Sequence, residues 1–157
     1  MAALSSKRNR AAGEHDELSS EEGRRRESSV SYLDWDLATA ARRVAEGLPT
    51  YTLEEVRSKL SLSKREFADV IQISERTLTR RTREDTLPPD ESDRVYRFSR
   101  LIELAAHVLG SEKEAREWMK EENYALGDAT PLELARTEPG AGLVEQLLGR
   151  IEHGLPA

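Results

Sequence analysis

The sequence predicts an all-α fold, and three observations support this prediction. Apolar residues recur at helical spacing from Leu33 onward, helix-capping residues precede these runs, and no segment alternates polar and apolar residues as a strand would. The 157-residue chain has no cysteine, which excludes disulfides and thiolate metal sites. No apolar run approaches the roughly 20 residues that cross a bilayer, so we expect no membrane contact and a cytoplasmic location.

Residues 1–30 are small, polar and charged, with six basic and six acidic side chains. Such a segment buries too little apolar surface to offset its ordering entropy, which predicts a disordered N-terminal arm. Its KRNR and GRRR runs either touch phosphates or belong to a solvated tail.

From Ser31 to Gly47 the pattern predicts a first helix, which Pro49 prevents from continuing. Three short helices follow, because Thr52, Ser63 and Ser74 each stand directly before a helical run. Thr52 and Ser63 have a glutamate three residues later, the pattern of a capping box, whereas Ser74 has Thr77 there. The apolar positions of the first helix are Leu33, Leu37, Ala40, Ala41 and Val44.

After Pro88-Pro89 the sequence predicts a longer helix, capped by Asp90 or Ser92 and closed by Gly110. Because it is apolar on two faces, we expect it to be a central helix packed on both sides. Ser111 then caps a further helix, a short PLELAR turn follows, and a last helix ends at Gly154. The two faces of the central helix comprise Val95, Phe98, Ile102, Ala105 and Leu109, and Leu101, Leu104 and Val108.

Residues 64–83 carry the pattern of a helix-turn-helix, whose second helix enters the major groove of DNA. Phe67, Ala68 and Ile71 supply the large-small-large set of the first helix, and Leu78 anchors the second. With Leu78 turned inward, the helical spacing turns the polar residues of the second helix outward. Suited to base edges are Glu75, Arg76, Thr79 and Arg80, and suited to phosphates are Ser74, Thr77, Arg81 and Arg83.

The charge distribution favours DNA contact at this helix. Although the whole chain carries −6, the segment 74–83 has four arginines and one acid. Two positions depart from the motif, since Gln72 stands where glycine is common and Arg81 where a second apolar anchor is common. The alternative interpretation is a helical corner with a solvated arginine face.

The sequence offers no pattern typical of an enzyme. His15, His107 and His153 lack metal-ligand spacing, and neither GxxxxGK[ST] nor GxGxxG occurs. The adjacent acids Glu121 and Glu122 point to different helix faces, which suits solvation rather than acid–base chemistry. We therefore predict no catalytic site, no metal and no cofactor.

Beyond these patterns, the chain resembles the Xre/MbcA/ParS-like antitoxins of bacterial toxin–antitoxin pairs. The likeness covers about residues 30–157 and is carried by the order and spacing of several segments, although Asp128 departs from a family glycine. They are REFADVIQISERTLTRR, LPPDESDRVYRFSRLIELAAHVLG, EAREWMKEENYALG and TPLELARTEPGAGLVEQLLGRIEHGLPA.

The resemblance implies an Xre-type helix-turn-helix joined to a small helical C-terminal toxin-binding domain. It divides the chain into an arm (1–30), a DNA-binding module (31–88), a linking helix (89–110) and a toxin-binding domain (111–157). It further implies that the chain blocks the active site of a RES-type, NAD-consuming toxin and that the complex represses its own operon. The DNA-facing residues that it implies are Ser74, Arg76, Thr77, Arg80 and Arg81. The toxin-facing residues that it implies are Leu126, Gly127, Pro131, Leu132, Thr137, Gly140, Gly142, Val144, Leu147, Arg150 and Gly154.

The glycines of the C-terminal part point independently, though less sharply, to a partner. Glycine inside a helix is unfavourable by about 1 kcal/mol relative to alanine, so its repeated use there favours a close docking surface. Ordinary capping and tight helix packing are the alternative for each glycine taken alone. Three functional readings follow: an antitoxin that binds operator DNA as a homodimer, a stand-alone regulator with an oligomerising or ligand-sensing C-terminal domain, and a neutraliser without DNA binding.

Overall fold

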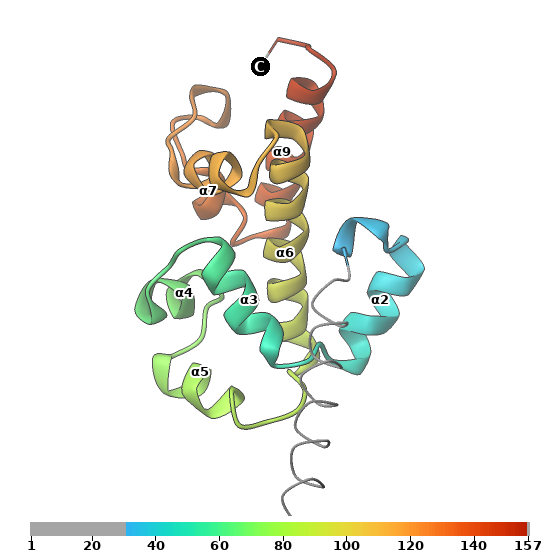
Figure 1. The fold of residues 1–157 in the computed structure, drawn as a ribbon, viewed down its shortest axis with the longest axis vertical. Helices are drawn as coiled ribbons and strands as arrows, with labels where there is room; N and C mark the ends of the chain where they lie inside the picture. Colours follow the sequence, from blue (N-terminus) through green and yellow to red (C-terminus); the bar gives the residue numbers. More distant parts are fainter. Residues whose placement is uncertain (1–30, 157) are drawn as a thin grey trace, which may run out of the picture. The chain divides into compact units, whose positions relative to one another are not determined.

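The computed structural model describes residues 31–156, so the predicted N-terminal arm lies outside the described residues. Every regular element within the described range is helical, which confirms the all-α prediction (Figure 1). Extended pairing there is limited to two isolated bridges, Pro49 with Thr86 and Asn123 with Ala129.

The segment predicted as one N-terminal helix is divided into a 3-10 turn, η1 (Tyr32–Asp34), and helix α2 (Leu37–Glu46). The division occurs at Asp36, whose carboxylate accepts a hydrogen bond from the Thr39 N–H and so starts α2 afresh. The predicted apolar face is only partly buried, since Leu37 is 83% exposed and Ala40 is the buried residue of α2.

Helix α3 (Tyr51–Lys59) begins before Thr52, so the capping box predicted there is wrong. Thr52 is fully buried, and its hydroxyl donates to the Pro49 carbonyl at 2.6 Å instead of accepting from the helix. The other two caps are confirmed. Ser63 and Glu66 form the complete capping box of α4 (Lys64–Val70), and Ser74 caps α5 (Glu75–Arg81) through the Thr77 N–H.

Helix α6 (Pro89–Leu109) starts at the second proline, so neither predicted cap, Asp90 nor Ser92, is the capping residue. Proline suits the first helical position because its φ is already helical and its missing N–H has no partner there. The buried Ser92 hydroxyl accepts from the Leu48 N–H and donates to the Leu87 carbonyl, which ties α6 to the chain before α3.

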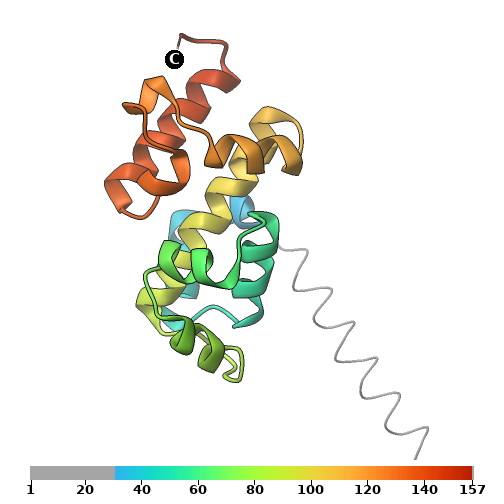
Figure 2. The same cartoon turned by 90° about the vertical axis from the view of Figure 1, so that its left-hand side faces the viewer.

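As predicted, α6 is central: it contacts η1, α2, α3, α7 and α9 (Figures 1 and 2). It ends at Gly110, which adopts a left-handed φ of 98°. Ser111 then caps α7 (Glu112–Lys120), as the sequence predicts, and a 3-10 turn, η2 (Tyr124–Leu126), follows. Helices α8 (Pro131–Leu134) and α9 (Glu138–Glu152) complete the described chain.

A single hydrophobic core joins the helices of both halves. Its largest fully buried side chains come from α3 and α4 with their C-cap residues, and from α6, α7 and α9. The helix-turn-helix and the C-terminal helices therefore both pack against α6. These buried side chains are Phe67, Phe98, Leu53, Leu60, Ile71, Leu101, Ile102, Met119, Leu148, Val95 and Val144.

Candidate nucleic-acid interface and C-terminal surface

The turn between α4 and α5 is held in the geometry of a helix-turn-helix. Phe67, Ala68, Ile71 and Leu78 are all buried, as the motif requires. Gln72 adopts a left-handed φ of 59°, the conformation for which glycine is the common choice at this position.

Hydrogen bonds connect this turn to α6 and to the segment before α9. Arg94 of α6 donates to the carbonyl of Ile71 at 3.0 Å, and the Gln72 side chain donates to the carbonyl of Arg136 at 3.3 Å. Arg97, also on α6, donates to the same Arg136 carbonyl at 3.3 Å. The C-terminal segment before α9 is therefore fastened to the turn that precedes α5.

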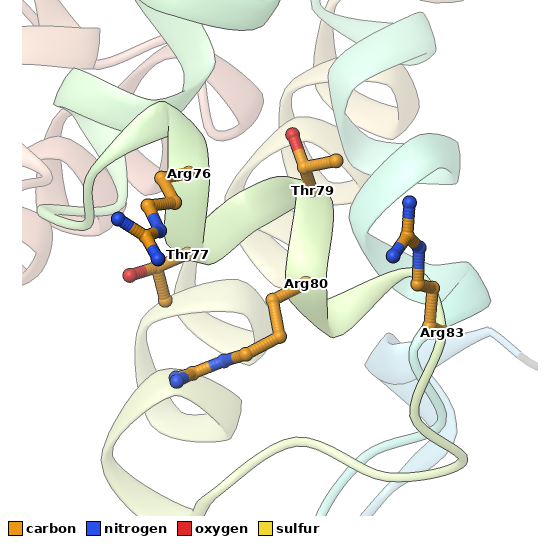
Figure 3. Close-up of a pocket in the computed structure, with 5 residues that line it drawn as sticks. All are labelled: Arg76, Thr77, Thr79, Arg80 and Arg83. Carbon is orange, nitrogen blue, oxygen red and sulfur yellow. The ribbon is translucent and has the colours of Figure 1, made fainter.

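The outward face of α5 forms a hollow of about 460 Å³ lined by Arg76, Thr77, Thr79, Arg80 and Arg83. Figure 3 shows the Arg76 and Arg80 guanidinium groups projecting away from α5, whereas Arg83 stands on the chain that follows the helix. Within the described part of the chain, no carboxylate forms an ion pair with Arg76 or Arg83, and Arg80 lies 3.6 Å from Glu84. Among the described residues, this face therefore presents two unpaired cations, Arg76 and Arg83, beside Arg80, which is paired with Glu84.

The hydroxyl groups near this face already have partners. Ser74 accepts from the Thr77 N–H at 3.0 Å and donates to the Thr77 hydroxyl at 3.0 Å. The Thr79 hydroxyl donates to the Glu75 carbonyl at 2.9 Å and accepts from the Lys64 ammonium group. Any new hydrogen bond of the Thr79 hydroxyl therefore requires these bonds to be exchanged, whereas within the described residues the Arg76 guanidinium has no ion-pair partner.

Arg81 is placed differently from the phosphate-facing position that the sequence suggests. Its guanidinium forms two parallel hydrogen bonds with Glu91 of α6, at 2.7 and 2.8 Å, and a third with Glu84 at 2.8 Å. The Arg81 side chain is only 14% exposed, and these hydrogen bonds, that of Glu91 foremost, raise its pKa. Arg81 thus anchors α5 to α6, in the place where an apolar anchor is common.

The C-terminal residues implied by the family resemblance separate into two sets. Four of them are core or packing residues with little accessible surface, and the others remain within reach of a partner. The buried residues are Pro131, Gly140, Val144 and Leu147; half-buried are Leu126, Leu132 and Gly142; exposed are Gly127, Thr137, Arg150 and Gly154.

The glycines of α9 differ in the same way. A Cβ atom on Gly140 would lie 2.0 Å from the Leu134 carbonyl oxygen, so this glycine permits α8 and α9 to approach each other. A Cβ atom on Gly142 or Gly149 would meet nothing within 4 Å. Tight packing within the chain therefore explains Gly140 and leaves the two open glycines unexplained. They stand seven residues apart and so lie on one face of the helix.

The structure also brings forward a residue outside the predicted site. The Tyr124 side chain is 91% exposed. Among the described residues no His, Asp and Glu cluster could hold a metal, and no described helix is long and apolar enough to span a bilayer.

The α4–turn–α5 unit has an exposed arginine face and packs against α6, and a second helical module packs against the same helix. This arrangement defines a helix-turn-helix protein with a C-terminal accessory domain. Residues 39–100 match the model of the antitoxin Xre-like helix-turn-helix domain. Residues 104–154 match that of the antitoxin Xre/MbcA/ParS C-terminal toxin-binding domain. The chain belongs to the Xre family of antitoxins, which is a family of binding proteins and not of enzymes.

Proteins named Antitoxin Xre match this chain over about seven tenths of its length. The protein from Yersinia enterocolitica is 35% identical over 69% of this chain and 75% of its own length. That from Photorhabdus laumondii is 34% identical over 70% and 76%. A chain of the M. tuberculosis MbcT–MbcA toxin–antitoxin complex has a similar fold. Its TM-score is 0.55 at 22% identity, over 69% of this chain and 96% of that one.

Proposed function

We propose that this antitoxin binds and neutralises a RES-type, NAD-consuming toxin by covering its active site, and represses its own operon through α5. One observation carries the proposal: residues 104–154 match a toxin-binding domain, and the same central helix α6 also packs against a helix-turn-helix whose second helix, α5, has an arginine-lined face. The M. tuberculosis neighbour of similar fold was solved as a toxin–antitoxin complex, which supports a protein partner for the C-terminal helices.

Arg76 and Arg80 are the residues that read the operator in this proposal. An arginine that bonds a guanine edge through two N–H groups contributes about 1–3 kcal/mol of base discrimination. Arg83, the Thr77 hydroxyl and the exposed amide at Ser74 bind the flanking phosphates. A homodimer presents two such helices to a two-fold operator, because a single module of this size buries little DNA surface.

The DNA-reading part is tested with the double variant Arg76→Ala, Arg80→Ala in a mobility shift on DNA upstream of the gene. We expect operator binding to be lost while toxin binding is retained. Lys113→Ala on α7 is the matched control, because this cation is exposed and lies outside the reading face. Unchanged operator affinity of the double variant would mean that α5 is not the reading helix. Wild-type affinity should also fall steeply with salt, since phosphate contacts release counterions.

The toxin-binding part is tested by co-expression with the neighbouring reading frame and purification through a tag on this chain. We expect a partner that co-elutes in fixed ratio, is toxic when expressed alone and consumes NAD⁺ until this chain is added. A neighbour that neither binds nor harms the cell would leave a stand-alone helix-turn-helix regulator, the second candidate. The exposed arginine face of α5 is the observation that favours this second candidate, because DNA binding through α5 does not require a toxin.

A further inference from the structure

Tyr124 is the most exposed large apolar side chain of the described residues, at 91%. Within that part of the chain no hydrogen bond to its hydroxyl is present, and its ring belongs to none of the aromatic contacts. An aromatic ring in water forgoes the burial that makes tyrosine and tryptophan dominant in interface energetics. The position therefore calls for a partner.

The backbone beneath this ring is fixed by several hydrogen bonds. The Asn123 side chain accepts from the Ala125 N–H at 2.9 Å, and the Tyr124 carbonyl accepts from the Gly127 N–H at 3.1 Å. The Asn123 carbonyl accepts from the Asp128 N–H at 3.0 Å, and Leu126 packs against the core. Because the loop is already ordered, docking of the ring requires little further loss of conformational entropy.

The sequence on either side of this ring carries acidic side chains without ion-pair partners in the described part of the chain. Glu121, Glu122 and Asp128 are exposed, and no ion pair involves any of them within residues 31–156. A complementary surface therefore offers an apolar pocket of ring size with lysine or arginine at its rim.

We propose that Tyr124 is the apolar anchor of the toxin interface, inserted into a basic-rimmed pocket of the cognate toxin. This inference rests on the proposed function. Tyr124 lies within the toxin-binding domain, on the 3-10 turn that also contains Leu126 and that ends at Gly127. It is absent from the toxin-facing residues that the family resemblance implies. The anchor thus adds to the toxin-facing surface a contact whose energy comes from burying one ring.

The test measures binding of the full chain to the purified toxin encoded beside it, by calorimetry at 0.15 M salt. Tyr124→Ala is expected to weaken binding at least tenfold, and Tyr124→Phe, which keeps the ring, to stay within about twofold of wild type. Leu37→Ala is the matched control, because Leu37 is 83% exposed but lies on α2, outside the toxin-binding domain. It is expected to change nothing.

Operator binding and the far-ultraviolet circular dichroism spectrum of Tyr124→Ala should both match wild type, since the ring supports nothing in the free chain. Toxin affinity within twofold of wild type for Tyr124→Ala overturns the anchor but leaves the antitoxin proposal standing. An equal loss for Leu37→Ala also overturns it, because any exposed apolar residue would then serve. If the wild-type chain itself fails to bind the toxin, the proposed function falls and the anchor with it.

Discussion

The ion pair between Arg81 and Glu91 allows the sharpest test of how α5, the proposed reading helix, is attached to α6. Replacing Glu91 by alanine removes two of the three hydrogen bonds of the Arg81 guanidinium and leaves Glu84 as its carboxylate partner. Removing one member of a buried ion pair destabilises a protein by about 3–5 kcal/mol. Because Arg81 is 14% exposed and keeps Glu84, we expect a smaller loss, about 2–3 kcal/mol.

The companion variant replaces both charges, Arg81→Met with Glu91→Leu. Replacing a buried pair by apolar residues of similar volume is often neutral or stabilising. Such a replacement suits Arg81, because helix-turn-helix motifs commonly have an apolar anchor at this position of the second helix. We therefore expect the double variant to unfold within about 1 kcal/mol of wild type and to bind operator DNA nearly as well.

Urea denaturation followed by circular dichroism gives the free energy of unfolding, and a mobility shift gives operator affinity for the same samples. Glu91→Ala is expected to lose operator affinity as well as stability, because α5 loses its attachment to α6. A loss of stability below about 0.5 kcal/mol would refute the reasoning, since that is the behaviour of a surface pair. So would a double variant as unstable as the single one.

Three further outcomes follow from the structure. Gly140→Ala should destabilise the free chain by about 1–3 kcal/mol, because its Cβ meets the Leu134 carbonyl oxygen. Gly142→Ala should instead stabilise the free chain by about 0.5–1 kcal/mol, because alanine favours the helix and its Cβ meets no neighbouring atom there. The same substitution should weaken toxin binding. Thermal melts measure the stability of both variants, and toxin titrations measure their binding. The Ser63 side chain holds the pKa of Glu66 below its ordinary value of 4.5. Stability from this cap is therefore present above pH 4.5 and is lost as pH falls through the lowered value. Glu66→Gln should make the acid limb of a pH–stability curve shallower, and an unchanged limb would contradict this.

The sequence by itself determined the elements whose causes are local. Ser63, Ser74 and Ser111 cap helices because each side chain bonds an N–H three residues ahead, within reach of any chain that starts a helix there. Gly110 ends α6 for the equally local reason that a left-handed φ suits glycine. The helix-turn-helix, with its buried Phe67, is likewise encoded in about twenty consecutive residues.

The tertiary structure alone decided the roles that depend on distant partners. Thr52 has the sequence of a cap but is buried, and the Ser92 hydroxyl bonds to the Leu48 N–H, 44 residues away. The sequence predicts Arg81 as a phosphate contact, whereas in the folded chain its guanidinium is paired with Glu91 of α6. Gly140 and Gly142 look alike in sequence, and only the approach of Leu134 separates them. In each case a polar residue or a glycine is compatible with several local structures, and packing against another element determines which one forms. The physical reason is that an unpaired buried polar group or a steric overlap is strongly unfavourable.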